Sequence, residues 1–490
     1  MNQPVNQAAI PLPVRPIELA RLMLCLPFYI MLGLMLTEAL LSATTTYLVI
    51  QAGRDVMKGG LFVQDLLWIL GSQSCAYVAG AISWIFAERA GFLAYGRYML
   101  RFARDNRQQT KSLGDKDARE RVEPFLTGET FYVYFHLLYE IEGDLRLLLG
   151  LVFNVVVLGT QIDSSLPMAY ALVAVVLFLL QWTMRKRVAH AYLENQRMTN
   201  RMTAQGYTAW DNVFTGNRYN LRLWIAGFKV KLRDGLDAQI RAIMTKEGLS
   251  ATSAILGLSI VFVTMAFVAG RNPGDTEILI ALAATLPRQI ELTNDVHQFT
   301  SGWNELLAAW TKLRGVSDNM HPAPDPDHDA RIKFERLILR DGAETKTVGT
   351  LDEAMALVMA SPHGRINVRG GNGSGKSTLL TALKAAVKTR GYYWPTGDRL
   401  AFQFAQGAEP EDADEDDDET RKPEKRPGFS SGERQIRALR EIVENTHASI
   451  YLLDEWDANL DLNNRAAADE LVERLAKRAR VVEISHRDRA

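Results

Sequence analysis

One stretch decides how this chain is interpreted: Gly370-Gly371-Asn372-Gly373-Ser374-Gly375-Lys376-Ser377, which has the spacing G-x-x-x-x-G-K-S. Residues 366–368 (Ile-Asn-Val) before it suit the end of a strand, and residues 377–384 after it suit a helix. Glycines at this spacing let successive backbone N–H groups face one anion at a helix N-terminus. Lys376 is then expected to hold the β- and γ-phosphates of a nucleotide, with Ser377 as a ligand to Mg²⁺ and Thr378 beside it.

Two further apolar runs end in side chains that suit phosphate chemistry. Residues 449–453 (SIYLL) predict a buried parallel strand, and Asp454 and Glu455 follow it directly. Because ligands meet the carboxyl ends of parallel strands, Asp454 is expected near Mg²⁺ and Glu455 near the attacking water. Residues 480–485 predict another strand, which leads to His486, a candidate contact for the γ-phosphate.

The composition of the whole chain limits the class of protein. A chain of 490 residues is expected to hold more than one domain. Its net charge of −1 provides no positive field for nucleic acid, so no nucleic-acid partner is expected. The only two cysteines, Cys25 and Cys75, both lie in apolar runs, which argues against a disulfide framework and against a cysteine metal site.

The first part of the chain predicts a membrane domain over residues 1–316. A helical span needs roughly 20 mostly apolar residues, and several runs approach or exceed this length. The last of these runs turns polar after Leu286. Six spans are expected, at about 22–50, 61–86, 145–160, 166–182, 249–269 and 276–300.

The distribution of basic residues predicts the topology. Segments 88–143 and 185–248 hold 9 and 12 Lys and Arg residues, whereas segments 51–60, 161–165 and 270–275 hold 2, 0 and 1. Because basic loops stay in the cytoplasm, both long segments, both termini and the nucleotide site are expected on the cytoplasmic side of an inner membrane. The stretch 317–330 contains three prolines and is expected to be a linker, with the second domain at 331–490.

The order of motifs in residues 331–490 resembles the ATP-binding cassette (ABC) family. The phosphate loop is followed by S-x-G-E-x-Q at 430–435, which resembles the signature motif of that family. Asp461 resembles its D-loop aspartate, and Gln406, or alternatively Gln403, resembles its Q-loop glutamine. Residues 18–316 add a topology similar to that of half-size exporters. The expected fold is therefore a multi-domain membrane protein, with an all-α six-helix transmembrane domain followed by an α/β phosphate-loop ATP-binding cassette.

The resemblance implies a site shared between two copies. In this family ATP, with Mg²⁺, lies between the phosphate loop of one copy and the signature motif of the other. The resemblance thus implies that Ser430, Gly432 and Glu433 meet the nucleotide of the partner. It also implies that Asp461 helps to join the copies and that Gln406 serves both the metal and hydrolysis. Ser430 and Glu433 equally fit a helix capping box, a purely structural alternative. A second copy of the chain is the expected partner, with a heterodimer left open.

The chain departs from the family pattern in two places. Asp341 stands where the family usually has an aromatic residue that stacks on adenine. Only 24 residues separate Gln406 from Ser430, where the family builds a helical subdomain. This interval includes nine acidic residues in the eleven positions 409–419, which predict a solvated loop. Coupling segments between the two halves are expected near 209–223 and near 103–121.

Several charged residues fall inside the predicted membrane domain. Glu38 lies in the middle of the first span, where it could contact cargo, relay a proton or pair within the bundle. Arg288, Glu291 and Asp295 are spaced i, i+3 and i+7 and share one helical face. That face is expected to line a wet cavity or to belong to a cytoplasmic extension of the helix.

These features predict an ATP hydrolase that exports a peptide-like or amphipathic small molecule across the inner membrane by alternating access. Trp456 after Glu455 resembles the cyclic-peptide and siderophore-precursor exporters. Two alternatives remain. One is import of a peptide or vitamin by the same architecture. The other is a low-turnover, ATP-gated regulatory or assembly protein in the membrane.

Overall fold

The computed structural model describes residues 14–60, 62–321, 325, 327–395, 400–406, 431–458 and 460–485. These residues belong to two compact units, which we call the helical unit and the sheet unit. The helical unit is formed by Val14–Met99 and Gly128–Asp318. The sheet unit contains Leu100–Thr127 and the chain from Asn319 onward, so it is assembled from two separate stretches of sequence. Ser430, His486 and the acidic stretch 409–419 lie outside the described residues.

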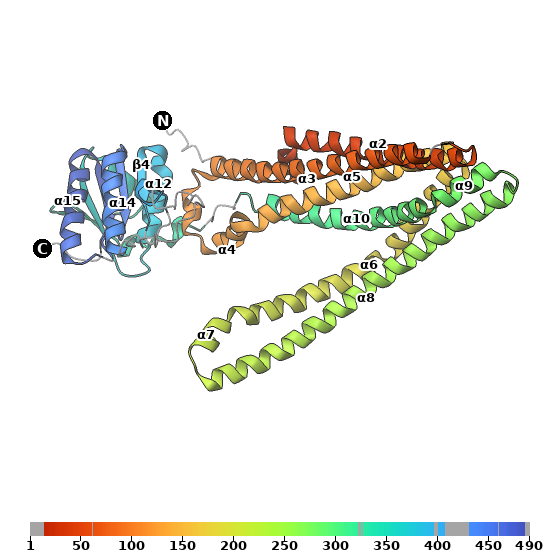
Figure 1. Ribbon diagram of the computed structural model, residues 1–490. Helices are drawn as coiled ribbons and strands as arrows, with labels where there is room; N and C mark the ends of the chain where they lie inside the picture. Colours follow the sequence, from red (N-terminus) through yellow and green to blue (C-terminus); the bar gives the residue numbers. More distant parts are fainter. Residues whose placement is uncertain are drawn as a thin grey trace, which may run out of the picture. The chain divides into compact units, whose positions relative to one another are not determined.

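The helical unit consists of long helices joined by short connections (Figure 1). In Figure 1, α6 and α8 run side by side as a long hairpin with the short α7 at its tip. Its elements are α1 (Pro16–Ala20), η1 (Arg21–Met23), α2 (Leu26–Met57), α3 (Phe62–Asn106), α5 (Thr130–Gln161), α6 (Ser165–Tyr207), α7 (Ala209–Phe214), α8 (Arg218–Arg271), α9 (Thr276–Ala284) and α10 (Leu286–Asp318).

Four helices of the described residues are long and apolar enough to cross a membrane: α2, α3, α6 and α8. Each is longer than a bilayer requires, since about 20 residues span the hydrocarbon region. The chain is consistent with a membrane protein on this ground. The core of the unit is apolar, with Leu158, Leu166, Val173, Val261 and Val296 all fully buried.

The predicted fold class is wrong. The described residues form fifteen α-helices and one small, mixed, six-stranded sheet, rather than six membrane helices followed by an α/β cassette. Two of the six predicted spans, 145–160 and 276–300, do not correspond to any of the four apolar helices. The first lies in α5, where Glu142, Asp144 and Arg146 interrupt the apolar sequence. The second is divided at Thr285 into the nine-residue α9 and the polar α10.

The sheet unit is built around a sheet of order β2-β1-β3-β6-β5-β4 among the described strands. β3, β6, β5 and β4 are parallel neighbours, whereas β1 pairs antiparallel with both β2 and β3. The strands are β1 (Ile338–Asp341), β2 (Glu344–Lys346), β3 (Gly364–Arg369), β4 (Gly391–Trp394), β5 (Ile450–Asp454) and β6 (Arg480–Ile484).

Helices bury the apolar side chains of this sheet in two clusters. One cluster joins Ile366 and Val368 of β3 to α11 and α12, and the other joins Leu453 of β5 to α14 and α15. Ile366 and Val368 lie in the same cluster because side chains two residues apart along a strand point to the same face of the sheet. The helices of the unit are α11 (Leu351–Met359), α12 (Lys376–Val387), α13 (Gln403–Gln406), α14 (Ser431–Asn445) and α15 (Leu462–Arg478), with 3₁₀ turns η4 (Asp329–Arg331), η5 (Phe334–Arg336) and η6 (Lys388–Arg390).

The segment between α3 and α5 packs against the sheet unit as part of it. It forms η2 (Thr110–Gly114), α4 (Lys116–Pro124) and η3 (Phe125–Glu129). η2 contacts α12, the helix that follows the glycine loop. Lys111 of η2 also forms an ion pair with Asp329, at 2.7 Å between Nζ and Oδ2. Residues predicted near 103–121 to couple the two halves therefore include a turn that touches α12.

Candidate nucleotide-binding site

The glycine loop connects β3 to α12, as the sequence predicted for residues 370–375. Gly373 and Gly375 adopt positive φ angles of 73° and 88°, which a residue with a side chain rarely adopts. The Lys376 ammonium donates to the Gly370 carbonyl at 2.8 Å and so lies across the loop itself. The hydroxyl of Ser374 is buried and has no hydrogen-bond partner among the described residues. A buried hydroxyl without a partner in this position fits a bound anion, which would accept a hydrogen bond from it.

Asp454 at the end of β5 lies beside the start of α12. Its carboxylate accepts a hydrogen bond from the Ser377 hydroxyl, so the two predicted magnesium ligands lie together. Tyr393 of β4 also reaches Asp454, with 3.4 Å between its Oη and the carboxylate Oδ2. Hydroxyl and carboxylate oxygens are ligands that Mg²⁺ prefers, so this pair fits the ion that a bound nucleotide would bring.

Burial controls the electrostatics at this point. It raises the pKa of the Asp454 carboxyl above its ordinary value, and the negative charge of Glu455 adds to the rise. The hydrogen bond from Ser377 and the charge of Lys376 act in the opposite direction. Burial and the neighbouring Asp454 likewise raise the pKa of Tyr393, which therefore remains a neutral phenol. The site is thus short of positive charge for a buried carboxylate, a deficit that a divalent cation would remove.

Glu455 follows β5 in a strained backbone conformation. Its φ is 47°, in the left-handed region that non-glycine residues seldom occupy. Its backbone N–H donates to the Ile484 carbonyl of β6 at 3.0 Å, which holds the strained residue in place. Strain of this kind costs on the order of 1–3 kcal/mol and concentrates at functional sites. A half-buried carboxylate held this way beside Asp454 is suited to accept a proton from water.

The other residues predicted for this site lie on different elements. Gly432 and Glu433 lie in the first turn of α14, and Gln406 ends α13, where its side chain is outside the described part of the structure. Asp461 is the N-cap of α15, where its carboxylate accepts from the backbone N–H of Asn464 at 2.7 Å. This capping role was not predicted from the sequence. Asp461 remains a predicted contact with a second copy.

Asp341, which stands in place of the expected adenine-stacking aromatic, has a structural partner. Its carboxylate accepts from the Nη2 of the buried Arg480 at 2.6 Å. The ion pair joins the end of β1 to the start of β6 across β3, which lies between them in the sheet. An acidic side chain at this position therefore contributes to the sheet rather than to recognition of a base.

A buried polar network behind Glu455 was missed in the sequence analysis. Glu483 of β6 is only 1% exposed, and its carboxylate accepts hydrogen bonds from both Nε and Nη2 of Arg365, each at 2.6 Å. The indole N–H of Trp456 donates to the same carboxylate at 2.9 Å. The sequence did contain one sign of this network, namely a single acidic residue inside the apolar run 481–484. A buried charge is stable only when it is paired, so this residue needed a basic partner.

Among the charged residues predicted in the membrane half, Glu38 forms an ion pair between two helices. In the helical unit, Arg146 of α5 binds Glu38 of α2 at 2.5 Å and also pairs with Glu142. A Cβ added to Gly80 of α3 would lie 2.8 Å from the Glu38 Oε1, so the glycine leaves room for the ion pair. Of the roles left open for Glu38, pairing within the bundle is the one that these contacts display.

Arg288 of α10 belongs to a second polar group in the same unit. It donates to Ser42 of α2 at 2.7 Å and to Asn154 of α5 at 3.2 Å, and it pairs with Glu291 at 2.6 Å. Asp295 lies one to two turns further along α10 and is half-buried. Together with Glu38 and Arg146, these side chains form a polar seam among α2, α5 and α10.

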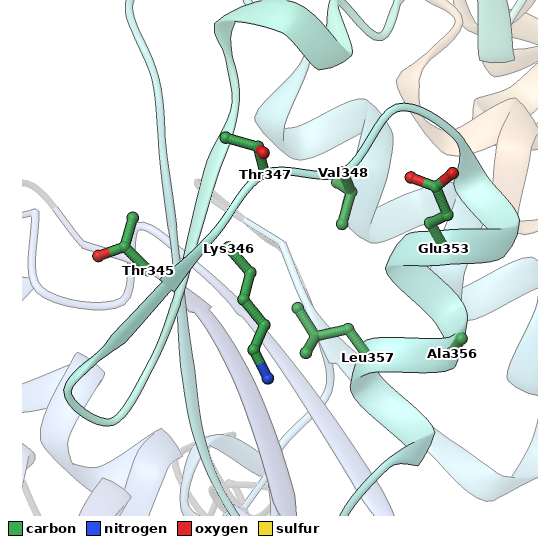
Figure 2. A pocket seen from close by; sticks show the side chains of 7 residues that line it. All are labelled: Thr345, Lys346, Thr347, Val348, Glu353, Ala356 and Leu357. Carbon is green, nitrogen blue, oxygen red and sulfur yellow. The ribbon is translucent and has the colours of Figure 1, made fainter.

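A shallow hollow between β2 and α11 is separate from the residues described above. Figure 2 shows the side chains of Lys346 and Leu357 extending into it from the strand and the helix. None of the predicted site residues lines it.

A scan against models of known protein families gives no match, and a search of curated proteins gives none either.

Proposed function

We propose that this chain is an ATP-driven membrane transporter that works as a dimer and moves a peptide-like or amphipathic small molecule. One observation carries the proposal: Ser377, Asp454 and Glu455 come together beside a glycine loop, in a chain that also has four long apolar helices. The first part of this observation suits nucleotide hydrolysis, and the second suits a membrane setting.

In this proposal, each residue of the site has one task. The backbone N–H groups of residues 370–375 and the Lys376 ammonium bind the phosphates, after Lys376 releases the Gly370 carbonyl. Ser377 and Asp454 hold Mg²⁺, which neutralises phosphate charge when it is bound with ATP. Glu455 orients the attacking water and accepts its proton. His486 and Gln406 remain proposed contacts for the γ-phosphate and for the metal.

The membrane setting is proposed from the same residues. Four spans, like six, place both ends of the chain on one side, and the basic segment 88–143, which follows the second span, favours the cytoplasmic side of an inner membrane for both ends. Only α6 crosses between this segment and the basic segment 185–248, so four spans would put 185–248 on the opposite side. In the helical unit, Ser42, Asn154 and Arg288 already bond to one another, so they identify no cargo. A peptide-like cargo is proposed from the resemblance of Trp456 after Glu455 to the cyclic-peptide and siderophore-precursor exporters.

A low-turnover, ATP-gated regulatory protein is the second candidate. The observation that favours it is the ion pair of Asp341 with Arg480, because it occupies the place of the expected adenine stack. A weakly held base would reduce turnover at a given ATP concentration. Import by the same architecture differs from export only in direction.

ATP hydrolysis by the purified chain in lipid tests the proposal. Glu455→Gln should lower kcat by about 10²–10⁴-fold, the usual contribution of a positioned proton acceptor. Glu470→Gln removes the same charge from an exposed position on α15 and should leave the rate unchanged. Equal rates for wild type and Glu455→Gln would sink the hydrolytic function. Uptake of labelled peptides by inside-out vesicles would support export, and uptake only by right-side-out vesicles would support import.

A further inference from the structure

The residue after Glu455 is held from two sides by side chains that are far apart in the sequence. The Trp456 carbonyl accepts a hydrogen bond from the Gln435 amide at 2.5 Å, and its indole N–H donates to Glu483 at 2.9 Å. Trp456 is itself only 3% exposed. Gln435 belongs to the beginning of α14, whereas Glu483 belongs to β6. Trp456 therefore links the start of α14 to the centre of the sheet.

The sheet end of this link is rigid. Arg365 clamps both oxygens of Glu483 and lies over the Trp456 ring, with 5.7 Å between its Cζ and the ring centroid. Two residues further along β3, the Asn367 amide donates at 2.9 Å to the hydroxyl of Ser485, the residue that follows β6. Bidentate arginine–carboxylate pairs are geometrically specific as well as strong. The Trp456 indole is thus fixed to a part of the sheet that has little freedom to move.

Glu455 directly precedes Trp456, the residue that bonds to both this anchor and α14. Its own N–H is tied to Ile484, and its φ of 47° leaves it in a conformation that only its surroundings maintain. A small shift of Gln435 would act on the Trp456 carbonyl, which is one residue from Glu455. Displacements below 1 Å at a reacting group are enough to change a rate substantially.

We propose that Trp456 is a positioning residue that couples the start of α14 to the orientation of Glu455. The inference rests on the proposed function, in which the start of α14 meets the nucleotide bound by a second copy. When that nucleotide engages α14, Gln435 moves the Trp456 carbonyl while Glu483 and Arg365 hold the indole. The Glu455 carboxylate of the same copy then turns toward its own water. Each site thereby senses whether the other is filled.

The test compares ATP hydrolysis and ATP binding by the full chain in lipid. Trp456→Phe keeps a buried aromatic ring but removes the indole N–H together with the five-membered ring that carries it. Gln435→Leu removes the donor to the Trp456 carbonyl. Each should lower kcat by about 10-fold, while the Kd for ATP and the number of sites per chain stay within about twofold of wild type. Trp394→Phe is the matched control, since Trp394 is a buried tryptophan in the same core cluster and should retain the wild-type rate.

The double variant Gln435→Leu/Trp456→Phe separates coupling from general damage. If both side chains act through one link, the double variant should lose no more than about 10-fold, because coupled residues are not additive. Losses that multiply to about 100-fold would overturn the link, as would a fall in the number of ATP sites that parallels the fall in rate. Hydrolysis by Trp456→Phe equal to that by Trp394→Phe would also overturn it. Absence of Glu455-dependent hydrolysis in the wild type would instead remove the proposed function and this inference together.

Discussion

Gly375 is the position where the glycine loop tolerates a side chain least. It caps α12 with a φ of 88°, and an added Cβ would lie 2.7 Å from the Arg331 carbonyl oxygen and 2.8 Å from the Ile332 Cα. The left-handed conformation costs a residue with a side chain roughly 1–2 kcal/mol. Overpacking against backbone atoms adds about 1–3 kcal/mol, since neither atom belongs to a flexible side chain. Gly375→Ala should therefore strain the loop by about 2–5 kcal/mol.

The loop can relieve this strain only by leaving the conformation in which its N–H groups converge. Because 1.4 kcal/mol corresponds to about tenfold in affinity, ATP should bind about 30-fold to several thousand-fold more weakly. The measurement is equilibrium binding of a fluorescent ATP analogue to the purified chain in lipid. Gly371→Ala is the control from the same loop, because no atom lies within 4 Å of its added Cβ. If both variants bind the analogue equally well, the loop does not hold the nucleotide in the conformation described here.

Further outcomes follow from the surroundings of other residues. Since burial raises the pKa of Asp454, its carboxylate form becomes available only as pH rises above the ordinary range of an aspartate, and Mg²⁺-dependent binding of the analogue should strengthen over that rise. The same shift means that the metal-free sheet unit loses stability over that rise, which thermal unfolding without Mg²⁺ would detect. Arg365→Leu should destabilise the chain by about 3–5 kcal/mol by leaving Glu483 buried without its cation, and Arg365→Leu/Glu483→Leu should recover most of the loss in urea unfolding. Cys75 is exposed on α3 whereas Cys25 is buried, so a membrane-permeant maleimide should label Cys75 first, and equal labelling rates would contradict these positions.

The arrangement around the glycine loop could be predicted from the sequence because local rules govern it. The glycine spacing imposes the backbone of residues 370–375, and the rule for parallel strands places Asp454 near Ser377. The Trp456 and Glu483 link depends instead on the register of β5 and β6. Register between distant strands is a tertiary property that a single sequence does not display.

The membrane half was predicted less well for a related reason. Hydropathy treats each residue alone, whereas Arg146 and Glu38 neutralise each other across two helices. The run 145–160 looked like a separate span because its sequence is uncharged from Leu147 onward, whereas in the structure it is the second half of α5, which also carries Glu142, Asp144 and Arg146. The sequence shows that the predicted sixth span changes from apolar to polar after Leu286. It was nevertheless assigned to one span, where the structure has two helices that meet at Thr285.

The division of the sheet unit into two stretches of sequence has a practical consequence for anyone who wishes to isolate it. A chain cut within 317–330 would look like a natural excision of the nucleotide half. It would lose residues Leu100–Thr127, and with them the η2 turn against α12 and the partner of Asp329. The helix that begins at the phosphate loop would then present to water a surface that the intact chain covers. A soluble fragment is better sought by grafting η2 back than by moving the cut along the linker.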